Sequence, residues 1–154
     1  MTYAAVRIRG VVNVKPDTKR TLRLLNLTRA NHCVLLEENP STKGMLQVAK
    51  DYITWGEIEK DVLSKLITTR GKMEGDKELT KDYIKSATSY DSVEKLSQAI
   101  LDNKFRYKDI PNIKPIFRLN PPKRGYEGIK RSFKNKGALG YRGKGINKLI
   151  ERMI

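Results

Sequence analysis

Cysteine, histidine and tryptophan each occur only once in this 154-residue chain. The lone cysteine, Cys33, excludes a disulfide within the chain and favours a reducing compartment. Together with the single histidine, His32, it cannot supply the four ligands of a structural zinc site. We therefore expect the protein to work without a bound metal ion or other cofactor.

Long apolar stretches are also missing from the sequence. No run approaches the roughly 18 apolar residues that would span a bilayer. The opening MTYAAVRIRG is charged too early for a signal peptide. Hydrophobic residues make up 38% of the chain, which is low for a globular protein but enough for one domain with a modest core. We expect a soluble intracellular protein that does not enter a membrane.

Positive charge is what the sequence has in excess. Lys and Arg number 32 against 17 Asp and Glu, which gives a formal net charge of +15. The distribution is uneven: residues 1–56 have 9 basic and 4 acidic groups, residues 57–110 have 11 of each, and residues 111–154 have 12 and 2. Such an excess indicates a polyanionic partner, either nucleic acid or an anionic surface. We expect both ends of the chain to contact it, with the neutral middle as a spacer or protein contact.

The most basic stretch is residues 118–145, with nine Lys or Arg, one acid and six glycines. Its apolar residues keep neither the helical nor the strand period for long, so we expect it to stay outside the core and to be ordered by a polyanion. Its aromatic residues are suited to stacking on unpaired bases. The alternative is a solvated, disordered tail, as most charge runs are. Against that alternative, residues 146–154 follow with the apolar face of a helix.

Strand and helix patterns alternate through the first third of the chain. Apolar and polar residues alternate over residues 3–14, which predicts a strand with Arg7 and Arg9 side by side on one open face. We expect Trp55 to pack in the core rather than to stack on a base. The predicted order is strand 3–14, helix 17–27, strand 32–37, helix 43–52 capped by Ser41 or Thr42, and a short extended piece within 51–58.

Helical patterns dominate residues 57–110, which we interpret as an inserted helical subdomain. One helix ends near Gly71, and Thr80 and Ser92 are predicted to cap two more. Two strand–helix units followed by a late strand predict an α+β fold, a ferredoxin-like split β-α-β sandwich. The predicted units are a β-α-β-α core at 1–56, the helical insert at 57–110, a returning strand at 111–122, a basic Gly-rich extension at 123–145 and a short C-terminal helix at 146–154.

Five motifs, taken in their order and spacing, resemble one protein family. They are VRIRG (6–10), LRLLNLTRANHCV (22–34), NPSTKGML (39–46), DYITWGEI (51–58) and FRLNPPKRGYEG (117–128). The set is similar to the archaeal form of the L-thirty family of large-subunit ribosomal proteins, whose eukaryotic counterpart is called L-seven. The resemblance covers almost the whole chain, although residues 70–110 match in helical pattern only. It implies a structural, non-enzymatic protein of the large ribosomal subunit, cytoplasmic and of archaeal origin.

The resemblance also implies partners and contact residues. The partners would be large-subunit ribosomal RNA, with a position near 5S ribosomal RNA, and neighbouring ribosomal proteins, with no small-molecule substrate. Charge in the sequence agrees with this, because Lys43 follows a predicted helix start, where a phosphate is favoured, and the cluster after Pro122 is strongly basic. The family's RNA contacts fall on Arg7, Arg9, Arg29, Asn31, Lys43, Lys123, Arg124, Lys130, Arg131, Lys134, Arg142 and Lys144.

Other interpretations are weighed against the ribosomal one. A non-ribosomal regulator or RNA chaperone would share the same charge. Residues 79–103 could form a DNA-binding helix-turn-helix, but Glu94 and Asp102 would spoil its recognition helix. VRIRGVV bears a faint likeness to the phosphate loop of acylphosphatases, without the arrangement of glycines and the asparagine that this chemistry needs. Paired carboxylates, a Ser-His-Asp set and a P-loop are also missing, so we expect no enzymatic activity.

Overall fold

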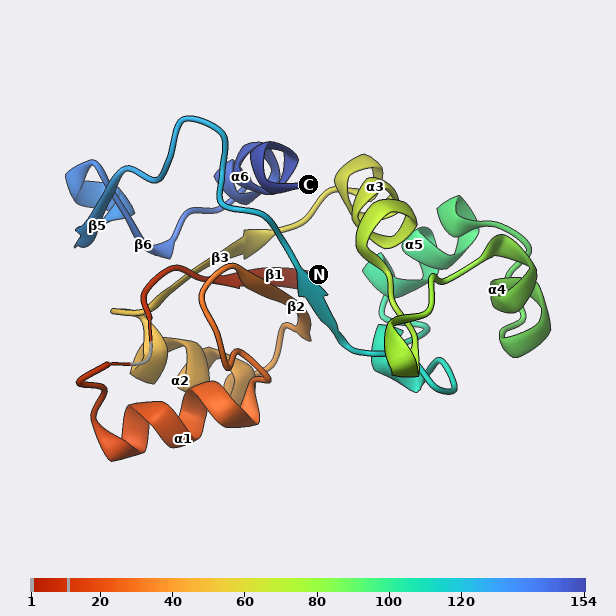
Figure 1. Ribbon diagram of the computed structural model, residues 1–154, viewed down its shortest axis with the longest axis horizontal. Coiled ribbons are helices and arrows are strands. Elements are labelled where there is room, and N and C mark those ends of the chain that lie inside the picture. The colour runs from red at the N-terminus through yellow and green to blue at the C-terminus, as the bar shows by residue number, and fades with distance from the viewer. Residues whose placement is uncertain (1, 11) are drawn as a thin grey trace.

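The computed structural model describes residues 2–10 and 12–154 and shows a six-stranded mixed sheet with helices on both faces (Figure 1). The strand order is β4-β2-β1-β3-β6-β5. This is the predicted α+β, ferredoxin-like class. The strands are β1 (Thr2–Arg7), β2 (His32–Glu37), β3 (Ile53–Glu57), β4 (Ile116–Arg118), β5 (Gly128–Ser132) and β6 (Gly137–Tyr141). The α-helices are α1 (Pro16–Leu24), α2 (Pro40–Ala49), α3 (Lys60–Arg70), α4 (Lys81–Ala87), α5 (Val93–Leu101) and α6 (Gly145–Met153), and the 3-10 turns are η1 (Glu74–Asp76), η2 (Tyr107–Asp109) and η3 (Phe133–Asn135).

Strand β1 is buried on both of its faces, between antiparallel neighbours β2 and β3. Its alternate side chains enter two different cores, as the period of a strand requires. Tyr3 and Ala5 pack with residues of α1 and α2, whereas Ala4 and Val6 pack with residues of α3 and α6. The prediction of an open face bearing Arg7 is therefore wrong, because α1 and α2 cover that side of the sheet (Figure 1). Val11, which the sequence placed in this strand, lies outside the described residues, as does Met1.

Helices α2, α4 and α5 each begin with a side-chain cap. The hydroxyls of Thr80 and Ser92 each accept the backbone N–H three residues later, which confirms both predicted caps. Helix α2 begins earlier than predicted, because Asn39 is its cap in place of Ser41 or Thr42. The Asn39 Oδ1 accepts a hydrogen bond from the Thr42 backbone N–H at 2.8 Å, and a proline occupies the first turn.

The helical insert shares one continuous core with the sheet. Leu63 of α3 and Leu96 of α5 are fully buried in the same cluster as Ala4 and Phe117. The rings of Phe117 and Tyr107 lie 4.9 Å apart between centroids, which joins β4 to the end of the insert. Figure 1 shows the insert on one side of the molecule, with α1, β5 and β6 on the other.

Part of the basic stretch belongs to the core. Strand β6 lies parallel beside β3, and β5 follows as the edge strand. Ala138 and Leu139 are buried, so the expectation that residues 118–145 stay outside the core is wrong for β6. Helix α6 lies where the sequence predicted a helix, and buries Ile146 and Ile150 against the sheet.

Asn147 fixes α6 to the junction between β3 and α3. Its Oδ1 accepts the Glu59 backbone N–H at 2.8 Å, and its Nδ2 donates to the Glu57 carbonyl at 3.1 Å. Because this amide is only 6% exposed, both bonds satisfy polar groups that would otherwise be buried without partners. The C-terminal helix is thus tied to the end of β3 by backbone groups as well as by apolar packing.

The contact between β3 and the turn that joins β6 to α6 predicts the effect of a substitution at Gly56. A Cβ added there would lie 1.9 Å from the Gly143 carbonyl oxygen, a backbone atom of that turn that would have to shift. We expect Gly56→Ala to lower the free energy of unfolding by about 2–4 kcal/mol, measured by urea denaturation. Gly44→Ala is the matched control, because nothing lies within 4 Å of its added Cβ. It should be neutral or stabilise α2 by about 1 kcal/mol, and equal destabilisation by both changes would contradict this account.

Candidate nucleic-acid interface

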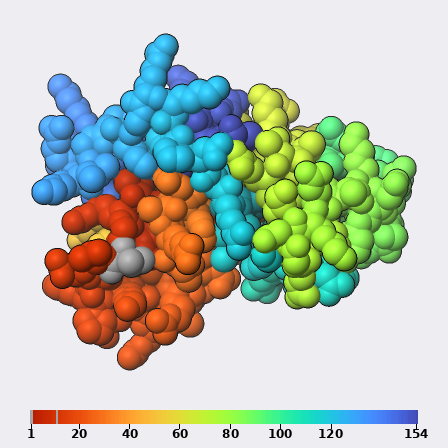
Figure 2. Space-filling view, in the orientation of Figure 1, coloured from red at the N-terminus to blue at the C-terminus, as the bar shows by residue number. Residues whose placement is uncertain are grey.

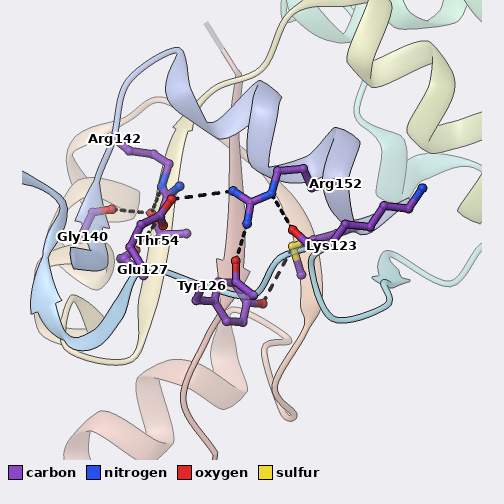
Figure 3. A network of polar contacts seen from close by, with 10 residues as sticks. Thr54, Lys123, Tyr126, Glu127, Gly140, Arg142 and Arg152 are labelled. Atoms are coloured by element: carbon purple, nitrogen blue, oxygen red, sulfur yellow. Dashed lines mark hydrogen bonds and ion pairs between the residues drawn. The ribbon is translucent and has the colours of Figure 1, made fainter. Parts of the chain in front are cut away.

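Arg142 follows β6 and is the buried centre of a polar network (Figure 3). Its Nε donates to the Thr54 Oγ1 and its Nη2 to the Ala138 carbonyl, each at 2.8 Å. Thr54 in turn donates to the Gly140 carbonyl at 2.8 Å, across the β3–β6 pair. Burial lowers the pKa of the Arg142 guanidinium, but arginine keeps its charge in proteins. This charge holds the extension on the sheet and does not face solvent.

Glu127 is the only acid of residues 118–145 and lies between two arginines. Its Oε2 is 3.8 Å from Arg142 Nη2, and its Oε1 is 3.7 Å from Arg152 Nη1. Arg152 of α6 also donates its Nε to the Lys123 carbonyl at 3.0 Å and its Nη2 to the Gly125 carbonyl. The loop before β5 is therefore attached to α6 by its backbone, which leaves the Lys123 side chain free to point outward (Figure 3).

Arg7 also serves the fold. It is 3% exposed, and its guanidinium donates to three carbonyls: Leu27 at 2.7 Å, Arg9 at 2.9 Å and Gly10 at 3.1 Å. Burial lowers the pKa of this guanidinium, and the three acceptors compensate for the desolvation of its charge. Arg7 therefore joins the ends of β1 and α1 and is not placed to meet a phosphate.

Asn31 lies in a turn and forms a hydrogen bond with Tyr126 of the extension. Its Oδ1 accepts the Tyr126 hydroxyl at 2.6 Å, and its φ of +68° is the left-handed conformation that asparagine tolerates. Burial raises the pKa of Tyr126 to about 12, so the phenol stays protonated and keeps donating at neutral pH. Asn31 is thus a fold contact between the first and last parts of the chain.

Lys43 is displaced from the predicted phosphate site by the earlier start of α2. It is the fourth residue of that helix, and its backbone N–H already donates to the Asn39 carbonyl at 3.0 Å. Its Nζ pairs with Glu38 at 3.2 Å. The backbone amide of Lys43 is therefore not open to a phosphate, although its side chain lies at the surface.

Eight of the twelve predicted contact residues are exposed, and six of these lie in the extension. Arg9 is half-buried, with its guanidinium 5.1 Å from the centre of the Tyr52 ring. In Figure 2 the extension, in blue, projects from the upper left edge of the molecule. The exposed eight are Arg29, Lys43, Lys123, Arg124, Lys130, Arg131, Lys134 and Lys144.

The exposed cations of the extension have no acidic partners. Within residues 2–10 and 12–154, none of them lies within 4.0 Å of a carboxylate oxygen, because the two arginines of the network occupy Glu127. Such a concentration of like charge is unfavourable by itself and is relieved by a polyanion. We call these exposed residues the extension cations: Lys123, Arg124, Lys130, Arg131, Lys134, Lys136 and Lys144. Lys136 was not among the contacts predicted from the sequence.

Helix α1 carries a second basic surface that the predicted contacts omitted. Lys19, Arg20 and Arg23 are exposed on its outer side, and none of the three pairs with a carboxylate of the described chain. The excess of basic over acidic residues in residues 1–56 could have indicated this surface from the sequence. In Figure 1, α1 and β5 lie on the same side of the molecule, opposite the neutral insert. The two basic regions of the chain therefore lie on one side of the molecule, and the neutral insert lies on the other.

Three other kinds of site can be compared with the described residues: a DNA-recognition helix, a metal centre and a membrane span. Helix α5 is a poor recognition helix, because its apolar side is buried and its exposed side carries Glu94 beside Lys95, with no excess of positive charge. Across the part of the chain that is described, no group of three or more His, Cys, Asp or Glu could hold a metal ion. Nor is any helix there long and apolar enough to cross a membrane.

The structural role of Arg142 predicts a loss of stability that an exposed neighbour would not show. Arg142→Ala removes two hydrogen bonds from a charged group and leaves Thr54 and Ala138 with one partner fewer. We expect the free energy of unfolding to fall by about 2–4 kcal/mol in urea denaturation. Lys144→Ala, two residues later and exposed, should change it by less than about 0.5 kcal/mol. A tolerated Arg142→Ala would show that the network does not hold the extension.

The chain is similar to known proteins of one family. Residues 3–53 match the family described as ribosomal protein L30p/L7e. Three similar relatives, each named large ribosomal subunit protein uL30, come from archaea. The Methanosphaera stadtmanae protein is 51% identical over 152 residues, 99% of both chains. The Methanopyrus kandleri protein is 50% identical over 149 residues, 96% of this chain and 100% of the relative, and the Thermoplasma volcanium protein is 48% identical over 151 residues, 98% and 92%.

These similarities extend from end to end, so they include the helical insert and the basic extension as well as the matched core. They agree with the resemblance in the five sequence motifs. The chain therefore belongs to the ribosomal protein L30p/L7e family, as a structural protein of the cytoplasmic large ribosomal subunit and not an enzyme.

Proposed function

We propose that this protein binds folded large-subunit ribosomal RNA through the extension cations and the basic face of α1. The observation that supports this most directly is that seven exposed Lys and Arg of the extension have no carboxylate within 4.0 Å in the described residues. Each contact between such a cation and a phosphate releases condensed counterions, which drives binding. Membership of a ribosomal family makes RNA the natural polyanion.

The proposed contact set differs from the one that the sequence implied. Arg7, Asn31 and Arg142 leave it, because their polar groups are used inside the fold. Arg9, Arg29 and Lys43 stay as peripheral contacts, since each is at least partly exposed. The centre of the set is the extension, which β6 and the arginine network hold in a fixed position. A fixed basic surface suits recognition of RNA by its shape, because the A-form major groove is too narrow for side chains to read.

A position near 5S ribosomal RNA is a second, finer part of this proposal, and it is supported by the family resemblance alone. The neutral insert would then face a neighbouring ribosomal protein, since it offers no excess charge to RNA. Ultraviolet cross-linking of assembled large subunits, followed by sequencing of the RNA attached to peptides of residues 123–144, tests the position. Cross-links to other ribosomal RNA only would contradict the 5S neighbourhood and leave RNA binding intact.

RNA binding through the extension predicts a loss that depends on salt. Replacing Lys130, Arg131 and Lys134 with Ala should weaken binding to purified large-subunit RNA and make the slope of log affinity against log salt shallower by about 2–3. The three side chains are exposed, so the urea unfolding midpoint should not change. Filter binding at several salt concentrations measures both the affinity and the slope.

The matched control removes the same charge from the insert. Lys77, Lys81 and Lys85 are exposed, and none forms an ion pair with a described carboxylate. Their replacement with Ala should leave the salt slope unchanged. Equal effects of the two triple variants would mean that net charge, and not this surface, determines binding.

A further inference from the structure

Phe133 is a large aromatic residue left exposed in the middle of the basic extension. It opens the η3 turn between β5 and β6 and is 42% exposed. Exposed cations surround it in the sequence, with Arg131 two residues before it, Lys134 directly after it and Lys136 three residues on. Single exposed apolar side chains are common, so exposure alone assigns no role to this one.

The ring of Phe133 is held in place from one side. The guanidinium of Arg142 lies 5.0 Å from the ring centre, a cation–π contact, and Arg142 is itself fixed by Thr54 and the Ala138 carbonyl. The edge of the ring reaches the start of α6, where its Cζ is 3.6 Å from the position of a Cβ on Gly145. One face of the ring is therefore occupied by a buried charge, while the side chain as a whole stays open to solvent.

The turn that bears Phe133 is also constrained. The Phe133 carbonyl accepts the Lys136 backbone N–H at 3.2 Å, with Lys136 in the left-handed region at a φ of +61°. The next residue, Gly137, passes so close to β5 that an added Cβ would lie 2.0 Å from the Arg131 carbonyl oxygen. The ring therefore needs little ordering when a ligand binds, which lowers the entropic cost of that binding.

Two other large apolar side chains are exposed in the extension, and neither has this arrangement. Tyr141 is 46% exposed, but its hydroxyl donates to Glu57 Oε1 and its ring lies 6.3 Å from that of Trp55 between centroids. Ile129 is 47% exposed and has no π face. Phe133 alone among the three combines an aromatic ring, a supporting cation and a basic surrounding.

We propose that Phe133 is a stacking platform for one unpaired base of the bound RNA. The base would lie on the ring face opposite Arg142, and the neighbouring lysines would neutralise the phosphates on either side of it. Stacking on aromatic rings is how proteins take up unpaired bases, and it tolerates any base because each has a π face. This inference rests on the proposed RNA binding and narrows the ligand to RNA with an unpaired nucleotide at this point.

The test compares two ligands of equal charge on the full chain. Fluorescence anisotropy measures binding of a labelled dodecauridylate and of an abasic phosphodiester with the same number of phosphates, at about 0.1 M salt. The unchanged protein should bind the uridylate at least about fivefold more tightly, and Phe133→Leu should abolish that preference without weakening abasic binding. Leucine keeps an apolar cover over Arg142, and the unfolding midpoint checks that the fold is intact. Ile129→Ala, on the adjacent strand and equally exposed, should keep the preference.

The outcomes separate this inference from the function on which it rests. Equal binding of both ligands by the unchanged protein would overturn the stacking platform and leave phosphate binding in place. A preference that survives Phe133→Leu, or that Ile129→Ala also removes, would overturn it too. Binding of neither ligand would count against the proposed RNA binding itself. The inference is supported only if the unchanged protein prefers the uridylate, Phe133→Leu loses that preference and Ile129→Ala keeps it.

Discussion

The buried guanidinium of Arg142 is the interaction on which the C-terminal half of the sheet depends. It joins β3 through Thr54, β6 through Ala138 and the loop before β5 through Glu127. A charge this far from water is tolerated only because hydrogen-bond acceptors and an anion surround it. Since Glu127 also contacts Arg152 of α6, a single acid connects the loop before β5, the end of β6 and α6.

The basic residues of this chain divide into two groups with different tasks. The first group consists of the buried arginines Arg7 and Arg142. The planar guanidinium of each donates to several fixed acceptors at once. The exposed extension cations are mainly lysines, which are strongly hydrated and flexible. The buried arginines hold the backbone that presents the lysines. This explains how a chain with a net charge of +15 keeps a packed core: Arg7 and Arg142 find their partners locally, and the extension cations lie at the surface.

The sequence was a good guide wherever one physical signal acted alone. The period of apolar residues placed β2 and α6, and side-chain hydroxyls placed two helix caps at Thr80 and Ser92. Prediction from the sequence failed where a residue type can serve either the fold or the surface. Arg7 reads as exposed charge because its partners are backbone carbonyls, which have no signature in sequence. Strand β6 was hidden because two of its five residues are glycines. Gly137 allows the close approach of β5, since an added Cβ would lie 2.0 Å from the Arg131 carbonyl oxygen, and Gly140 adopts a positive φ of +85°. The extension cations could be predicted, since charge density needs no tertiary information.

The pairing of β3 with β6 has a consequence for how the protein is made. It brings Thr54 beside Gly140, so two neighbouring strands of one sheet are separated by most of the chain. Parallel pairing across such a distance must close a long loop before its contacts stabilise it, and this slows folding. During synthesis the edge of β3 therefore stays open until β6 has emerged. The basic surface takes its final shape only after β6 and α6 have been added, so the proposed RNA binding by the extension requires both elements.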